Sequence, residues 1–239
     1  MRILAVESSA VTASAAILTD NILTAEYTVN YKKTHSQTLL PMIDEICAMT
    51  ETSADSFDVI AVSVGPGSFT GLRIGIATGK GIALALGKKM AAVPTLDAMA
   101  YNLFGTDKLI CAVMDARRRH LYNNIYYFNE ENSLCRLRQQ SLSSYEELAD
   151  ELNSLAKPVV FVGDGVQAAG EFFREKLTCG YEFAPPHMNT QRAASVAYLA
   201  MKMAERGELL DAAAVKPDYL RPSQAERELS EKEGIKANA

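Results

Sequence analysis

Residues 58–67 read Asp-Val-Ile-Ala-Val-Ser-Val-Gly-Pro-Gly, an apolar run that ends in a glycine turn. Residues 158–165 repeat this design as Pro-Val-Val-Phe-Val-Gly-Asp-Gly. A short apolar run bounded by glycine is typical of a buried strand followed by a tight turn. The two stretches therefore predict equivalent strands in two related halves of the chain.

The segments around these stretches follow one order in both halves. In the first half the patterning predicts strands at Arg2–Glu7, Ala13–Thr19, Ile22–Val29 and Asp58–Val64, and helices at Gln37–Met49 and Gly71–Leu86. In the second half it predicts strands at Leu109–Asp115, Leu121–Phe128, Leu134–Ser141 and Pro158–Val162, and helices at Tyr145–Leu155 and Val166–Lys176. A long helix at Gln191–Gly207 follows.

Three antiparallel strands followed by helix, strand and helix is the order of a ribonuclease-H-like lobe. Two duplicated lobes of this kind predict an α/β fold of the actin, hexokinase and Hsp70 class. We expect a first actin-like lobe over residues 1–105 and a second over residues 106–190. Residues 191–239 are expected to return to the first lobe as a helix and a tail, with a frayed end beyond about Glu226.

Proteins of this class hold a nucleotide between their lobes, where backbone N–H groups at turns attract phosphates. The residues that would form such a cleft here are Glu7, Ser8, Ser9, Gly65, Gly67, Asp115, Gly163, Asp164 and Gly165. In the simpler alternative the glycines only make turns, and Glu7 and Asp115 only accept N–H bonds from them. Because the turns carry no metal ligands and no paired phosphate-binding lysine, we expect no required cofactor and at most weak binding of ATP or ADP.

Composition narrows the functions further. The 239 residues carry 24 Lys and Arg against 29 Asp and Glu, and this net charge of −5 disfavours nucleic-acid binding by the chain alone. The basic cluster Arg117-Arg118-Arg119 is an exception for which a solvated turn is the simpler explanation. The four cysteines are far apart, as is typical of free thiols in a reducing compartment. No apolar run approaches the roughly 20 residues of a membrane span, so we expect a cytoplasmic protein.

Residues 63–73, Ser-Val-Gly-Pro-Gly-Ser-Phe-Thr-Gly-Leu-Arg, resemble the TsaB family. Supporting motifs lie at Ala5–Ser9, His35–Pro41, Val93–Ala98 and Tyr219–Pro222, and the resemblance covers Arg2 to about Arg227. TsaB proteins are paralogues of the catalytic subunit TsaD. They are needed for threonylcarbamoyl modification of the adenosine next to the anticodon, in tRNAs that read codons starting with A.

The resemblance implies a partner subunit without an activity of its own. Such a subunit would pair with TsaD, be joined by the ATPase TsaE, form a homodimer when TsaD is missing, and meet tRNA only through the complex, away from any membrane. TsaD-like proteins carry a His-x-x-x-His metal motif where this chain has Thr95 and Met99. Neither residue supplies an imidazole, and His35, His120 and His187 are scattered along the chain. We therefore expect no metal site.

Two helices suggest the surface that would meet the partner. Small residues recur every four positions at Gly71, Gly75, Gly79, Ala83 and Gly87, which places them on one face. Each interior glycine costs about 0.5–1 kcal/mol of helix stability, so we expect close packing against a partner; a helix buried in its own lobe is the alternative. The helix after His35 has a wider apolar arc than one buried face needs. The predicted interface comprises His35, Leu39, Leu40, Ile43, Cys47, Leu72, Gly75, Ile76, Gly79 and Ala83.

Two further functions stay open, a nucleotide-dependent kinase of the same fold and a peptidase. A serine peptidase needs a base within hydrogen-bond reach of its nucleophile. The sequence around Ser68 lacks the Gly-x-Ser-x-Gly pattern, and we expect Ser68 or Thr70 to cap the following helix instead. Since neither function has a complete set of residues, the partner subunit is the preferred interpretation.

Overall fold

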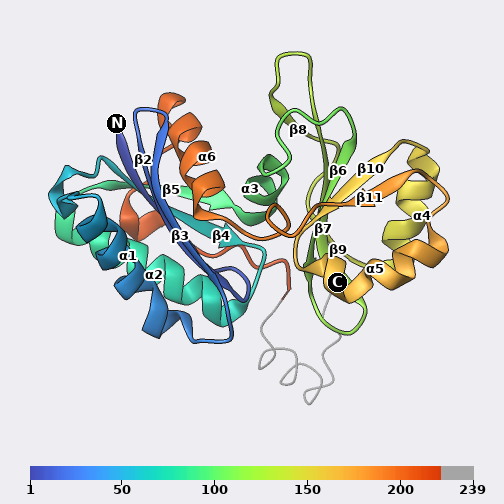
Figure 1. The fold of residues 1–239 in the computed structure, drawn as a ribbon, viewed down its shortest axis with the longest axis horizontal. Coiled ribbons are helices and arrows are strands. Elements are labelled where there is room, and N and C mark those ends of the chain that lie inside the picture. Colours follow the sequence, from blue (N-terminus) through green and yellow to red (C-terminus); the bar gives the residue numbers. More distant parts are fainter. Residues whose placement is uncertain (222–239) are drawn as a thin grey trace.

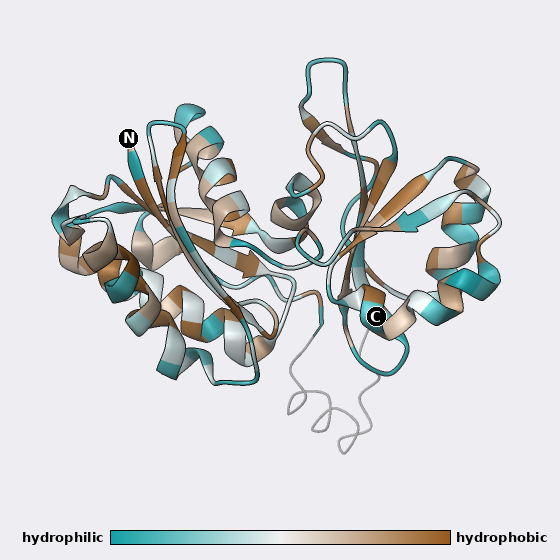
Figure 2. Ribbon diagram, viewed as in Figure 1, coloured by the Kyte–Doolittle hydropathy of each residue, from teal (hydrophilic) through white to brown (hydrophobic). Residues whose placement is uncertain are grey.

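The computed structural model describes residues 1–221 and shows two α/β lobes side by side (Figure 1). The frayed end expected beyond Glu226 lies outside the described residues. The strands in the middle of each lobe are the most hydrophobic part of the chain and are brown in Figure 2. Each lobe therefore has its own sheet and its own core.

The first lobe is built on a five-stranded sheet in the order β3-β2-β1-β4-β5. Its strands are β1 (Arg2–Glu7), β2 (Thr12–Thr19), β3 (Ile22–Asn30), β4 (Val59–Gly65) and β5 (Lys89–Pro94). β1, β2 and β3 form an antiparallel meander, whereas β4 is parallel to β1 and β5 is parallel to β4. A short 3-10 helix, η1 (Ala54–Ser56), precedes β4.

Helices cover both faces of this sheet because successive side chains of a strand point to opposite sides. Leu4 and Val6 pack with α1 (His35–Met49) and α2 (Phe69–Leu86). Ile3 and Ala5 pack on the opposite face with α6 (Ala193–Glu205). The chain thus returns to the first lobe after it has built the second.

The second lobe has a sheet in the order β11-β10-β6-β7-β8, with β9 also paired to β7. Its strands are β6 (Leu109–Asp115), β7 (His120–Phe128), β8 (Leu134–Arg136), β9 (Ser141–Ser144), β10 (Val159–Val162) and β11 (Tyr181–Phe183). α4 (Tyr145–Leu155) and α5 (Gly165–Lys176) cover one face. The short α3 (Thr95–Tyr101), which connects the lobes, packs on the other face.

The two sheets repeat each other in register and in turn geometry. β1 pairs with β4 from Ile3 opposite Val59, and β6 pairs with β10 from Leu109 opposite Val159. Gly65 and Gly163, at the ends of the equivalent strands, have positive φ angles of 126° and 118°. Residues with a Cβ rarely adopt this conformation. The predicted pair of duplicated lobes is confirmed.

Several elements differ from those predicted. The expected strand Leu134–Ser141 is two strands, separated by a segment in which Arg138 forms an ion pair with Glu151 of α4. β5 (6 residues), α3 (7 residues) and β11 (3 residues) were not predicted, because, unlike the apolar runs of β1 and β10, they are not marked by a terminal carboxylate or glycine turn. Elements this short do not establish a hydrophobic period.

The glycine stripe of α2 faces its own sheet, so the prediction that it faces a partner is wrong. A Cβ built on Gly75 would lie 2.1 Å from Oγ of Ser8, and one built on Gly79 would lie 2.4 Å from Cγ1 of Val62. The glycines therefore allow α2 to lie directly against β4 and the turn after β1. Other predicted interface residues are also buried within the lobe, namely His35, Leu39, Ile43, Leu72, Ile76 and Ala83.

Within residues 1–221, α2 is also the one helix long and apolar enough, by length and composition, to cross a membrane. Leu72 and Ile76 of this helix are part of the core of the first lobe. Its small residues contact the sheet, and it carries Arg73 and Lys80. These features are those of a core helix of a lobe.

Candidate functional site

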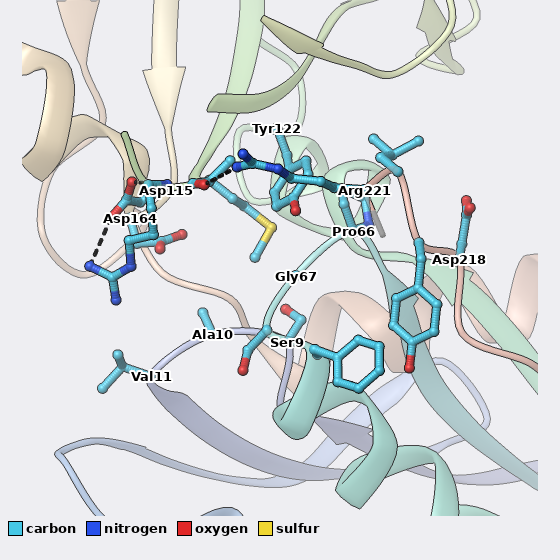
Figure 3. Close-up of a pocket in the computed structure, with 17 residues that line it drawn as sticks. Ser9, Ala10, Val11, Pro66, Gly67, Asp115, Tyr122, Asp164, Asp218 and Arg221 are labelled. Atoms are coloured by element: carbon cyan, nitrogen blue, oxygen red, sulfur yellow. Dashed lines mark hydrogen bonds and ion pairs between the residues drawn. The ribbon is translucent and has the colours of Figure 1, made fainter. Parts of the chain in front are cut away.

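A cleft of about 390 Å³ lies between the two lobes (Figure 3). The turns that follow equivalent strands of both lobes contribute to it, together with the end of the described chain. The lining residues are Ser9, Ala10, Val11, Pro66, Gly67, Ser68, Phe69, Met114, Asp115, Ala116, Arg117, Tyr122, Asp164, Asp218, Tyr219, Leu220 and Arg221. The duplicated fold thus forms a cleft in the place where the sequence predicts one.

The structure divides the predicted cleft residues into two groups. Ser9, Gly67, Asp115 and Asp164 line the cleft, whereas Glu7, Ser8, Gly65, Gly163 and Gly165 do not and are buried behind it. Ser8 donates a hydrogen bond from Oγ to the carbonyl of Gly71, 2.9 Å away, and so connects β1 to α2. The buried glycines have a packing role, because a Cβ on Gly163 would lie 2.2 Å from the carbonyl oxygen of Val113.

The carboxylates at the ends of β1 and β6 close their own turns. The Ser9 N–H donates to Oε1 of Glu7 at 2.6 Å, and the Arg117 N–H donates to Oδ1 of Asp115 at 2.8 Å. The Ser68 N–H donates in turn to the carbonyl of Ser9 at 2.6 Å. These three turn N–H groups are therefore satisfied within the protein, and they are not available to a phosphate.

Acidic and basic side chains nearly balance in the cleft. Asp115, Asp164 and Asp218 line it, and the cationic side chains that line it are Arg117 and Arg221. Arg117 forms an ion pair with Asp115 at 3.1 Å, and Arg221 donates to the carbonyl of Ala116 at 3.1 Å. Burial raises the pKa of Asp164, which accepts a hydrogen bond from Gln191. Such a set of groups does not favour a triphosphate.

A buried polar group lies directly behind the cleft. Glu7, Ser9 and Ser63 are almost fully buried, and within residues 1–221 Oε2 of Glu7 and both hydroxyls have no hydrogen-bond partner. Burial raises the pKa of Glu7, and the neighbouring Ser9 partly offsets this effect. A carboxyl group in this position favours its protonated, neutral form at the expense of the charged form.

The positions where TsaD-like proteins carry metal-binding histidines have structural roles here. Thr95 is buried and accepts a hydrogen bond through Oγ1 from the Gly65 N–H at 3.2 Å. Met99 is buried against the second sheet. A hydroxyl and a thioether do not fit the imidazole site of that motif. Over residues 1–221, no group of three or more His, Cys, Asp or Glu side chains is arranged to hold a metal ion.

Ser68 begins α2 rather than acting beside a base. Its Oγ accepts a hydrogen bond from the Gly71 N–H at 3.3 Å, which makes it the N-cap of the helix. The prediction that Ser68 or Thr70 caps this helix is confirmed for Ser68. A hydroxyl in this role satisfies one of the free N–H groups at a helix start.

Residues 218–221 cross the mouth of the cleft, and we call them the C-terminal strap. The Asp218 N–H donates to the carbonyl of Val64 in the first lobe at 2.7 Å. Its carboxylate accepts from Gln140 of the second lobe at 2.7 Å. Tyr219 stacks on Phe69 with ring centroids 4.7 Å apart. The strap therefore links both lobes. The motif Tyr219–Pro222 was the one feature of the sequence that pointed to this segment.

The exposed side of α1 and α2 differs from the face predicted as an interface. Of the predicted residues, Leu40 is exposed and Cys47 is partly exposed. Ala77, Gly81 and Leu84 of α2 are also exposed, and nothing lies within 4 Å of a Cβ built on Gly81. We call Leu40, Ala77, Gly81 and Leu84 the outer helical face. Leu40 was predicted, whereas Ala77, Gly81 and Leu84 were missed because they alternate with the more regular glycine stripe of α2.

The duplicated lobes and their shared cleft define a two-lobed protein of the actin-like class. Comparison with known proteins gives the family. A family described as "TsaD: tRNA N6-adenosine threonylcarbamoyltransferase" matches residues 23–229. The tRNA threonylcarbamoyladenosine biosynthesis protein TsaB of Bacillus subtilis is 31% identical over 95% of this chain and 96% of its own length. The chain therefore belongs to the TsaB family.

Two further relatives agree with this assignment. The TsaB protein of Escherichia coli is 29% identical over 98% of this chain and 100% of its own length. A crystal structure from Pseudomonas aeruginosa, of a protein with similarity to the peptidase YeaZ, superposes with a TM-score of 0.77 at 25% identity. That match covers 92% of this chain and 99% of the other.

Proposed function

We propose that the chain takes part in tRNA threonylcarbamoyladenosine biosynthesis as a partner subunit of TsaD, in the cytoplasm, without a catalytic site of its own. Similarity to proteins named for that pathway over nearly the whole chain supports the pathway. The cleft supports the absence of catalysis. Three of its turn N–H groups, those of Ser9, Arg117 and Ser68, bond to Glu7, Asp115 and Ser9 of the same chain, and that is the observation on which the proposal rests.

The outer helical face is the surface we assign to TsaD. Leu40 on α1 and Leu84 on α2 are 51% and 67% exposed, although leucine is usually buried. Nothing lies within 4 Å of a Cβ built on Gly81, so another helix can approach α2 closely there. The same surface would serve a homodimer when TsaD is missing. TsaE would join the TsaD complex, and the assembled complex would modify the tRNA.

Reconstitution from purified proteins tests this function. TsaD from the same organism, TsaE and a supply of threonylcarbamoyl-adenylate are incubated with unmodified tRNA, with and without the chain, and modified nucleoside is measured by mass spectrometry. We expect product only when the chain is present. An equal yield without the chain would contradict the proposal, and ATP turnover by the chain alone would favour the kinase alternative.

A further inference from the structure

A cationic groove of about 460 Å³ runs between α2 and the segment that follows the 3-10 helix η2 (Ala212–Ala214). Three cationic side chains line it: Arg73 and Lys80 from α2, and Lys216 from the later segment. Ile76, Ala77 and Pro217 provide apolar surface. Tyr219 lines both this groove and the cleft between the lobes. The groove is thus a second concave site, which adjoins the cleft at Tyr219.

The cations of this groove lack acidic partners. Within residues 1–221, none of Arg73, Lys80 and Lys216 forms an ion pair with a carboxylate. The chain as a whole carries five more acidic than basic residues. Three cations that have no carboxylate partner among residues 1–221 lie together in one groove, and such a group creates a local positive potential that attracts an anion.

Arg73 is held in place before any ligand binds. Its guanidinium lies over the ring of Phe69, 3.9 Å from the centroid, and its Nε donates to the Tyr219 hydroxyl at 3.0 Å. These contacts use one face and one N–H of the group and leave its two terminal nitrogens for a ligand. A fixed guanidinium fork matches two oxygens of a phosphate, and lysines add further charge.

We propose that this groove binds phosphodiester groups of RNA. The fork of Arg73 and the two lysines would contact successive phosphates, and the Tyr219 ring, 37% exposed, offers a surface on which a base can stack. The requirement for an anion follows from the groove itself, whereas the choice of RNA rests on the proposed function. Ala77 belongs both to the groove and to the outer helical face, so RNA bound here would lie next to TsaD.

The test is binding of a fluorescently labelled anticodon stem-loop RNA to the full chain, followed by anisotropy over a series of salt concentrations. The variant Lys80→Gln/Lys216→Gln should bind about tenfold more weakly at low salt. The slope of log affinity against log salt should fall by about 1.5, because two phosphate contacts are lost. Unlabelled RNA should displace the probe at lower concentration than ATP, inorganic phosphate or a polyglutamate peptide.

The control is Lys157→Gln/Lys176→Gln, which removes the same charge from exposed positions in the second lobe. It should change the affinity less than twofold. Equal losses in both variants, no binding by the parent chain, or stronger displacement by polyglutamate or ATP would each overturn the proposal. Reconstitution separates the two hypotheses: if the chain activates TsaD while the groove variant binds RNA like the parent, the groove proposal fails and the proposed function stands.

Discussion

Two glycines of α2, two positions apart, should respond differently to the same substitution. Gly81 faces open space, so Gly81→Ala gains only the better helix propensity of alanine, about 0.5–1 kcal/mol. Gly79 faces the sheet, and a Cβ there would lie 2.4 Å from Cγ1 of Val62 and 3.1 Å from Cε of Met90. Carbon atoms pack best at about 3.5–4.0 Å.

The two contacts at Gly79 differ in how easily they relax. Cε of Met90 is the end of a flexible side chain and can move. Val62 is β-branched, stiff at χ1 and fixed in β4, so α2 itself must shift. Overpacking of this kind costs about 1–3 kcal/mol. Since both variants gain the same helix propensity, Gly79→Ala should be less stable than Gly81→Ala by this whole amount.

Urea denaturation measures the difference directly. The free energy of unfolding and its dependence on urea are determined for the parent and both variants, at concentrations where the parent is monomeric, because self-association adds stability. We expect Gly81→Ala to lie above the parent and Gly79→Ala to lie below Gly81→Ala. If both variants unfold with the same free energy, the stripe does not pack against the sheet and the account of α2 is refuted.

Three other results are expected. Burial raises the pKa of Glu7, so the stability gained from its protonated form is complete below about pH 4.3 and is lost as the pH rises through the raised pKa. Glu7→Gln should therefore have a larger free energy of unfolding than the parent at pH 7. The difference between the two free energies should become smaller near pH 4. Calorimetry with ATP and magnesium should give a Kd no tighter than about 10 μM, on the order of −7 kcal/mol, because the turn N–H groups of Ser9 and Arg117 are already bonded to carboxylates; nanomolar binding would contradict this. Elemental analysis of dialysed protein should find no stoichiometric transition metal, because Thr95 and Met99 replace the imidazoles, and one equivalent of iron or zinc would show otherwise.

The duplicated fold could be predicted because its signal is local. Glu7 and Asp115 end apolar strands, and Gly65 and Gly163 lie at the ends of the equivalent later strands, so both halves have the same kinds of residue at their strand ends. Both glycines have a positive φ, which is the physical reason why glycine occupies these two positions. The position of Glu7 and Asp115 next to a turn also predicted the alternative in which these carboxylates accept N–H bonds from the turn.

The sequence did not predict in the same way which surface the glycine stripe of α2 packs against. Small residues at four-residue spacing indicate a close approach, but they do not say what approaches. Gly75 meets Ser8, which is 67 positions away, a pairing that only the folded sheet creates. The strap shows the same limit, because Arg73 and Tyr219 meet across a separation of 146 positions. Local patterning carries no information about either contact.

We propose that the chain supports tRNA modification through its outer helical face and not through its cleft. The most direct measurement is the threonylcarbamoyladenosine content of tRNA from cells depleted of the chain and supplied with variants. Asp115→Asn/Asp164→Asn, which alters the cleft, should restore the modified nucleoside to the level of the parent. Leu84→Glu, which places a charge on the outer helical face, should leave it low although the variant protein remains folded. Restoration by Leu84→Glu together with failure of the cleft variant would contradict the account.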